Sequence, residues 1–99
     1  MIVVLTEEAR ADLEHIGDYI AKDNPLRADT FVWELTSRCL ALADMPRAFP
    51  LVPRYEHTGV RRRPHGNYLI FYHVGEDVVH ILHVLNGAQD YESLLFPEE

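Results

Sequence analysis

The residues best suited to chemistry lie between positions 60 and 91, where arginines, histidines and tyrosines follow one another along the chain. Arg61, Arg62 and Arg63 form the densest positive charge in an otherwise acidic protein. Guanidinium groups can hold a phosphodiester and stabilise the charge of its transition state, while a histidine or tyrosine moves a proton. The histidines and tyrosines on the neighbouring strands and after them, with one aspartate, are Tyr68, His73, His83, Asp90 and Tyr91. The alternative is a solvated edge strand whose charge discourages aggregation, with the tyrosines at the edge of the core.

Metal and cofactor chemistry is not indicated by the remaining residues. The six histidines include His80 and His83, whose spacing on a strand points them to opposite faces of a sheet. The sequence has no pair of cysteines, no HExxH motif, no GxSxG motif and no glycine-rich phosphate loop. Cys39 falls on the apolar side of a predicted helix and is expected in the core. We therefore predict no metal site, no cofactor and no cysteine nucleophile.

The composition is that of one folded domain. The 99 residues are 47% hydrophobic, so we expect a single domain over 1–99 and not a disordered chain. Nine basic and sixteen acidic residues give a net charge of -7, which argues against direct sequence-specific nucleic-acid binding by the chain alone. A single cysteine excludes a disulfide framework, and neither a secretory signal nor an apolar run of ~18 residues is present. We therefore expect a cytoplasmic protein that does not enter a membrane.

The first half of the chain predicts a short strand over 2–5 and then a helical hairpin. Thr6 is a good N-cap for a helix over about 7–22, and Asn24-Pro25 begins a second helix that ends near Asp44. Trp33 lies off the apolar stripe of the second helix. Two alternatives stay open for it, packing on the edge of the core and facing a partner, and the sequence favours neither. The two apolar stripes consist of Ala9, Leu13, Ile16 and Ile20 in the first helix and Ala28, Phe31, Val32, Leu35, Cys39 and Leu42 in the second.

The second half predicts three strands, over about 59–63, 67–74 and 78–85. The segment Tyr68 to Tyr72 has no polar alternation, so its strand should lie centrally with both faces buried. The order β-α-α-β-β-β is that of an α+β fold, with the helical hairpin on one face of a mainly antiparallel four-stranded sheet and the other face partly open. The first strand is expected to run antiparallel to the second or the fourth. Candidates to pack on the core are Phe49, Leu51 and Val52 in the loop over 46–58, and Tyr91, Leu94, Leu95 and Phe96 in the tail.

Four segments carry a family resemblance: TEEARADLEHIGDYIA at 6–21, MPRAFP at 45–50, VRRRPHGNYLIFYHV at 60–74 and VVHILHVLNGAQD at 78–90. In this order they resemble the RelE/ParE superfamily of toxins from type II toxin–antitoxin modules, and they are more similar to ParE-type than to RelE-type proteins. Two places depart from the family pattern. His83 stands where a basic residue often precedes Val-Leu, and Ala88-Gln89 stands where a basic pair often precedes the aspartate, here Asp90.

The resemblance implies a toxin that is held inactive by an antitoxin encoded beside it. ParE-type toxins poison DNA gyrase, whereas RelE-type toxins cut messenger RNA on the ribosome. The acidic balance, the two departures and the placement of the only lysine, Lys22, on a helix favour a ParE-like toxin that acts by binding. A RelE-like ribosome-dependent endoribonuclease is the alternative, and a non-toxic relative that only binds partners is the third possibility.

Two binding surfaces follow from the resemblance. The antitoxin is expected to be ParD-like, with a ribbon-helix-helix domain and a disordered tail that folds on binding. Because the helices are acidic outside their apolar stripes, we expect a basic or amphipathic tail, with Asp12, Asp18, Asp29, Trp33 and Glu34 as the antitoxin-binding candidates. The target-binding candidates are Arg61, Arg62, Arg63, His83, Asp90 and Tyr91, with DNA gyrase as the expected target.

Overall fold

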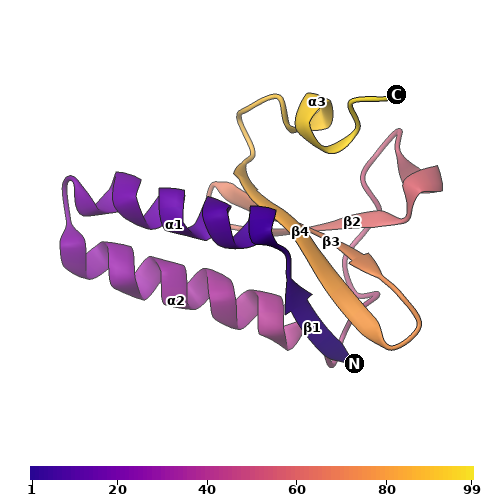
Figure 1. Cartoon of the computed structure of the whole chain (residues 1–99), viewed down its shortest axis with the longest axis horizontal. Helices are drawn as coiled ribbons and strands as arrows, with labels where there is room; N and C mark the ends of the chain where they lie inside the picture. Colours follow the sequence, from indigo (N-terminus) through magenta and orange to yellow (C-terminus); the bar gives the residue numbers. More distant parts are fainter.

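Two long helices pack on one face of a four-stranded sheet, and a short C-terminal helix lies on the other (Figure 1). The computed structural model describes residues 1–99. Its elements are β1 (Ile2–Leu5), α1 (Glu7–Ala21), α2 (Pro25–Ala41), a 3-10 turn η1 (Glu56–Thr58), β2 (Val60–His65), β3 (Tyr68–Val74), β4 (Val78–Asn86) and α3 (Tyr91–Leu95). The α+β class and the β-α-α-β-β-β order are confirmed, with α3 added in the tail. Neither α1 nor α2 combines the length and the apolar character that a membrane span requires.

Both helices begin where their capping residues predict. The Thr6 hydroxyl accepts a hydrogen bond from the Ala9 N–H at 3.1 Å, and the Asn24 amide oxygen accepts one from the Arg27 N–H at 3.0 Å. Pro25 occupies the start of α2, where its missing N–H costs nothing. The helix ends at Ala41, three residues before the predicted end, and a turn over 42–44 follows it.

The strand order is β1-β4-β3-β2, so β3 lies inside the sheet as its apolar sequence predicts. The expected antiparallel direction of β1 is wrong, because β1 pairs with β4 in parallel, from Ile2 opposite Val78 to Leu5 opposite Ile81. The reason lies in the helical hairpin. The terminal amino group of Met1 donates to the Ala43 carbonyl at 3.2 Å, so the end of α2 lies beside the start of β1. The helices thus return the chain to the level at which β1 begins.

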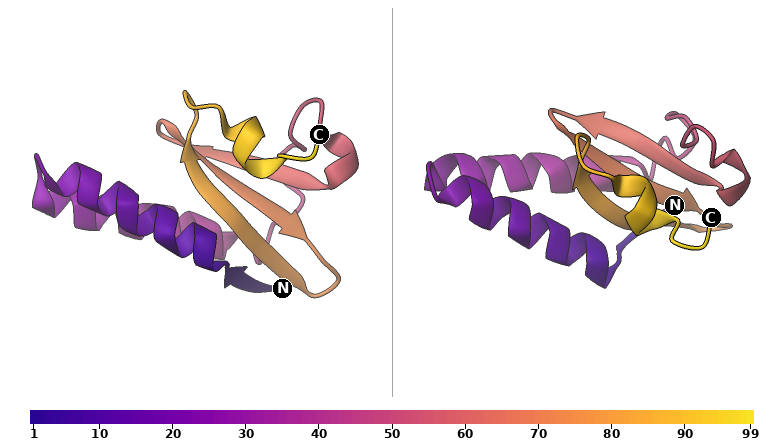
Figure 2. Two further views of the ribbon diagram at one scale, coloured as in Figure 1. Left: turned by 45° about the horizontal axis from the view of Figure 1, so that its top comes forward. Right: turned by 90° about the horizontal axis from the view of Figure 1, so that it is seen from above.

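The main core lies between the helices and the sheet. Ala9, Leu13 and Ile16 of α1 are buried there, while Ile20 and Val32 are partly buried at its margin. The two helices approach closely at Gly17, where an added Cβ atom would lie 3.2 Å from a Val32 methyl group. The other buried members are Phe31, Leu35, Cys39, Leu42, Ile70, Tyr72, Val79, Ile81 and Val84. The hairpin projects beyond the sheet, so the loop between its helices is exposed (Figure 2).

A second, smaller core covers part of the opposite face of the sheet. It consists of Val52, Val60, Phe71, Leu85 and Phe96. The Phe96 ring stacks on the Tyr55 ring at a centroid distance of 4.1 Å, which anchors the tail on the segment before β2. Tyr91 and Leu95 also pack there, but Leu94 is 53% exposed, so its expected role as an anchor is wrong. The face stays open near β1, where Ile2 and Val4 are exposed.

Candidate functional site

The three consecutive arginines of β2 do not form one basic surface. Because successive strand residues face opposite sides, Arg61 and Arg63 lie on the helix side, opposite Tyr72 and Ile70 in register, and Arg62 lies on the other side, opposite Phe71. Each arginine donates a hydrogen bond within the chain. The acceptors are the Phe49 carbonyl for Arg61 at 2.7 Å, the Tyr91 hydroxyl for Arg62 at 2.8 Å and the Arg38 carbonyl for Arg63 at 3.2 Å. Their guanidinium groups therefore all hold parts of the fold together.

Arg62 joins two other target-binding candidates at the start of α3. The Tyr91 ring that accepts its hydrogen bond packs on Phe71 at a centroid distance of 4.9 Å. Asp90 is the N-cap of α3, and its carboxylate accepts a hydrogen bond from the Ser93 hydroxyl at 2.6 Å. Arg62, Asp90 and Tyr91 therefore form one local group on the face of the sheet that the helices leave uncovered.

His83 lies apart from that group, on the helix side of the sheet, next to a bulge in β4. Phe71 pairs with His83 but Tyr72 pairs with Ile81, so one residue is extra at this point. Ile81 and Val84 both take core positions on the helix side, so the bulge adds one residue between them. His83 also reaches α1 on this side, where its Nδ1 atom lies 2.8 Å from a carboxylate oxygen of Asp12.

Asp12 therefore has a role within the fold, although it was a candidate for antitoxin binding. The same oxygen that meets His83 accepts a hydrogen bond from the Val84 N–H at 2.9 Å. The Asp12 side chain is only 16% exposed. The structure thus places one antitoxin candidate and one target candidate in a single contact that fastens α1 to β4.

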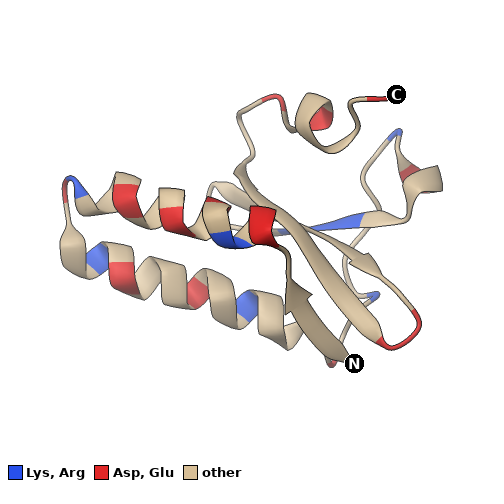
Figure 3. Ribbon diagram, in the orientation of Figure 1, with Lys and Arg blue, Asp and Glu red and all other residues tan.

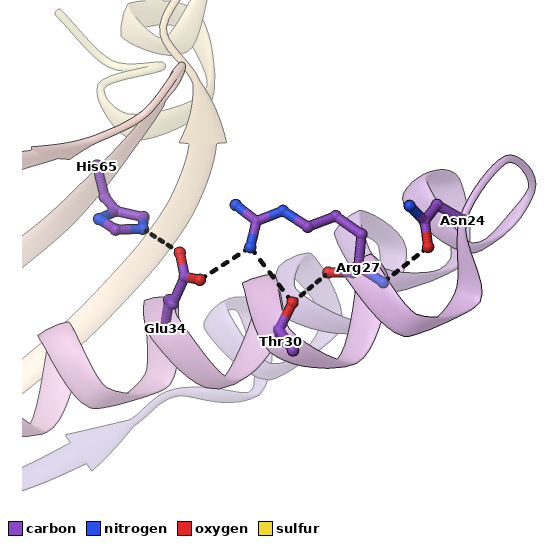
Figure 4. A network of polar contacts seen from close by, with 5 residues as sticks. All are labelled: Asn24, Arg27, Thr30, Glu34 and His65. Carbon is purple, nitrogen blue, oxygen red and sulfur yellow. Dashed lines mark hydrogen bonds and ion pairs between the residues drawn. The ribbon is translucent and has the colours of Figure 1, made fainter.

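Glu34 is also held within the fold, at the centre of a polar network that joins α2 to the end of β2 (Figure 4). One carboxylate oxygen accepts a hydrogen bond from Arg27 at 2.8 Å, and the other lies 3.1 Å from Nε2 of His65. These hydrogen bonds, that of Arg27 first, lower the pKa of the Glu34 carboxyl below its ordinary value of 4.5. The Arg27 guanidinium also lies over the Phe31 ring, 4.9 Å from its centroid.

The outer surface of α2 carries an exposed apolar stripe that sequence reasoning missed. Trp33 is 69% exposed, so it does not pack on the edge of the core. Leu26 and Leu40 lie seven residues before and after it and are 81% and 52% exposed. A spacing of seven places all three on one side of a helix, as in helices that pack against a partner helix. The signal was present in the sequence as a second heptad repeat beside the core stripe.

Beside this stripe, a groove between α1 and α2 has an acidic rim. Glu14, Asp18 and Asp29 are exposed there, and Gly17 and Val32 form part of its apolar floor. Its volume is about 410 Å³. Two antitoxin candidates, Asp18 and Asp29, therefore lie together at a groove suited to a cationic or amphipathic segment.

The remaining polar groups form neither a metal-ion site nor an activated thiol. No three of the histidine, cysteine, aspartate and glutamate side chains are arranged to hold a metal ion. Burial raises the pKa of the Cys39 thiol to about 12, so the thiolate that a nucleophile requires is absent near neutral pH.

Comparison with known proteins gives one consistent result. Residues 3–91 match the sequence profile of a family described as the ParE toxin of the type II toxin–antitoxin system parDE. The chain is 33% identical over 87 residues to the protein named Toxin RelE2 of Caulobacter vibrioides, a match that covers 88% of this chain and 96% of that protein. A solved structure titled as the chromosomal ParDE TA system from P. aeruginosa has the same fold, with a TM-score of 0.76 at 22% identity over 87% of this chain and 95% of that one.

Proposed function

The chain belongs to the ParE toxin family and is the toxin of a type II ParDE toxin–antitoxin system with a cognate ParD antitoxin, and from this premise we propose that it inhibits DNA gyrase by binding. The observation that carries the proposal is the use of the three β2 arginines within the fold. An enzyme that grips RNA needs several free cationic contacts on one surface. Here Arg61, Arg62 and Arg63 face two sides of the sheet and donate to internal acceptors.

The proposed gyrase-binding surface is the group of Arg62, Asp90 and Tyr91. It lies on the face of the sheet that the helices leave uncovered, so an antitoxin on α2 and a target on this face do not need the same residues. A few well-packed aromatic and arginine side chains can supply most of the energy of a protein interface. His83, the remaining candidate outside β2, enters the proposal only as a support of β4 through Asp12.

A second candidate function is ribosome-dependent cleavage of messenger RNA. It is favoured by the Arg62–Tyr91 contact of 2.8 Å, because a guanidinium beside a phenol is a pair that could bind a phosphodiester and transfer a proton. The name of the Caulobacter relative, Toxin RelE2, points the same way. Against it stand the net charge of -7 and the absence of lysine from the sheet.

Induction of the protein in cells separates the two functions. DNA breaks, the damage response and the integrity of messenger RNA are followed together after induction, in cells with a sensitive gyrase and in cells with a gyrase variant selected for resistance. Gyrase-dependent DNA breaks with intact messages support the proposal. Rapid cleavage of messenger RNA at the ribosome that is abolished by Arg62→Ala would contradict the proposal and support RNA cleavage as the function.

For the antitoxin, we propose that its tail binds α2 along the stripe of Leu26, Trp33 and Leu40, with basic side chains over the groove at Asp18 and Asp29. An amphipathic helix on an exposed heptad stripe is a common recognition mode, and opposite charge at the groove would fix its register. The side chains of the stripe are exposed in the isolated chain, and exposed apolar patches of this kind often bind a partner. A pull-down of the adjacent gene product by the toxin is the direct test.

A further inference from the structure

Three arginines converge where α2, β2 and the loop over 45–50 meet, and we call Arg38, Arg61 and Arg63 the arginine junction. Arg61 and Arg63 extend from the same side of β2. The Arg61 guanidinium donates to the Phe49 carbonyl at 2.7 Å, and that of Arg63 donates to the Arg38 carbonyl in the last turn of α2 at 3.2 Å. The Arg63 guanidinium also lies over the Phe49 ring, 4.7 Å from its centroid.

The arginine junction has no negatively charged partner within the chain. None of the five ion pairs includes Arg38, Arg61 or Arg63, although the chain has sixteen acidic residues. The Arg38 side chain makes no hydrogen bond at all, while all three side chains are partly buried. Burial, and then repulsion from the nearby Arg38 charge, lower the pKa of Arg63. The positive charge at this point is therefore uncompensated and only partly solvated.

A buried hydroxyl beside the arginine junction also lacks a partner. Tyr72 is fully buried, and its hydroxyl has no hydrogen-bond partner of good geometry, although a backbone group of Phe49 lies near enough to oppose the rise in its pKa. Both Arg61 and Arg63 are close enough to act on its ionisation, since each opposes the rise in the pKa of Tyr72 that burial causes. Buried polar groups are normally hydrogen-bonded, so an orphaned one calls for an explanation. The arginine junction therefore has many hydrogen-bond donors on its guanidinium groups but no negatively charged acceptor.

We propose that the arginine junction binds the carboxylate of an aspartate or glutamate side chain of the antitoxin. This inference rests on the proposed toxin–antitoxin pairing. The planar guanidinium fork matches a carboxylate with two parallel hydrogen bonds, and such charge-assisted bonds are stronger than neutral ones. A single acidic side chain is favoured over a nucleic acid because a chain with a net charge of -7 repels a polyanion but accepts one carboxylate.

The two charged regions of α2 lie on different sides of the helix. Asp29 lies at the acidic groove near the start of α2, and Arg38 lies in its last turn. Figure 3 shows that both acidic and basic positions occur along α2. Nine residues are about 2.5 turns at ~3.6 residues per turn, so Asp29 and Arg38 lie on opposite sides of α2. The acidic side chain that binds the arginine junction and the basic side chains over the groove should therefore come from different parts of the antitoxin.

The experiment measures the affinity of the full-length toxin for the antitoxin encoded beside it, by isothermal titration calorimetry at two salt concentrations. Arg38→Gln should weaken binding by about tenfold or more and reduce the salt dependence. Its melting temperature should stay unchanged because the Arg38 side chain holds nothing in the free protein. Arg10→Gln, which removes the same charge from an exposed position on α1, is the matched control and should bind as the wild type does.

A charge exchange completes the test. Arg38→Glu should abolish binding, and replacing one acidic residue of the antitoxin tail by arginine should restore it. If Arg38→Gln and Arg63→Gln both bind within twofold of the wild type, the inference is overturned while the toxin–antitoxin pairing stands. If the wild-type toxin does not bind the antitoxin at all, the pairing and the inference fail together. Loss of RNA-oligonucleotide binding in Arg38→Gln, with antitoxin affinity unchanged, would likewise overturn the assignment of a carboxylate.

Discussion

Asp12 and His83 lie 71 residues apart in the sequence and 2.8 Å apart in the structure, measured from the carboxylate oxygen to Nδ1. The same oxygen accepts the Val84 N–H, so one carboxylate holds α1 against the part of β4 that extends beyond its pairing with β1. Both residues were candidates for partner surfaces. Their contact joins the helical layer to the sheet.

Replacing Asp12 should therefore destabilise the protein. Asp12→Ala leaves the Val84 N–H without its acceptor, and an unsatisfied buried donor costs about 1–3 kcal/mol. We expect that loss in the free energy of urea-induced unfolding. Asp18→Ala, on the exposed side of the same helix, should change stability by no more than about 0.5 kcal/mol. Equal effects of the two substitutions would show that the contact with β4 contributes nothing.

The core stripe of α2 gives a second prediction about stability. Leu35 is fully buried between the helices and the sheet, so Leu35→Ala should cost roughly 2–5 kcal/mol through lost burial and a residual cavity. Leu40→Ala makes the same change five residues later at a side chain that is 52% exposed, and its effect should stay within about 0.5 kcal/mol. Thermal and urea unfolding of both variants measure the difference, and similar losses would contradict the assigned core.

Much of this fold follows from local signals in the sequence. Thr6 and Asn24 cap the helices as their types predict, and the apolar residues of 68–72 lie in an inner strand. The separation of Arg62 from its two neighbours was also accessible, because strand alternation alone requires it.

Other features depend on distances that no local pattern encodes. The direction of β1 follows from two antiparallel helices of nearly equal length, which bring the end of α2 back beside the first residue of β1. The contact between Asp12 and His83 needs both this path and the bulge in β4, which shifts the alternation by one residue. The exposed stripe of α2 differs from these features, because the spacing of seven residues between Leu26, Trp33 and Leu40 is readable in the sequence.

The network around Glu34 predicts a pH dependence of stability. Arg27 and His65 lower the pKa of Glu34 in the folded protein relative to 4.5, its ordinary value. Folding therefore gains stability from the ionised carboxylate above that pH, and the gain is lost as the pH falls through the folded-state pKa. The difference in urea midpoint between the wild type and Glu34→Gln should be largest near neutral pH and shrink below about pH 4.5. Glu14→Gln, at an exposed position of α1, is the control substitution.

The last prediction concerns Trp33 and the antitoxin. Its side chain is 69% exposed in the free toxin, so Trp33→Ala should leave the melting temperature unchanged. If the antitoxin tail packs on the stripe, Trp33 is its central anchor, and removing a central aromatic group from an interface often costs more than about 2 kcal/mol, or ~30-fold in affinity. Tyr19→Ala removes an aromatic side chain of similar exposure from α1 and serves as the matched control, with affinity expected to stay within a few-fold of the wild type. Loss of neutralisation in cells should accompany the loss of affinity for Trp33→Ala alone. Equal affinities for the wild type and Trp33→Ala would show that the antitoxin binds elsewhere, and the stripe on α2 would then need another partner.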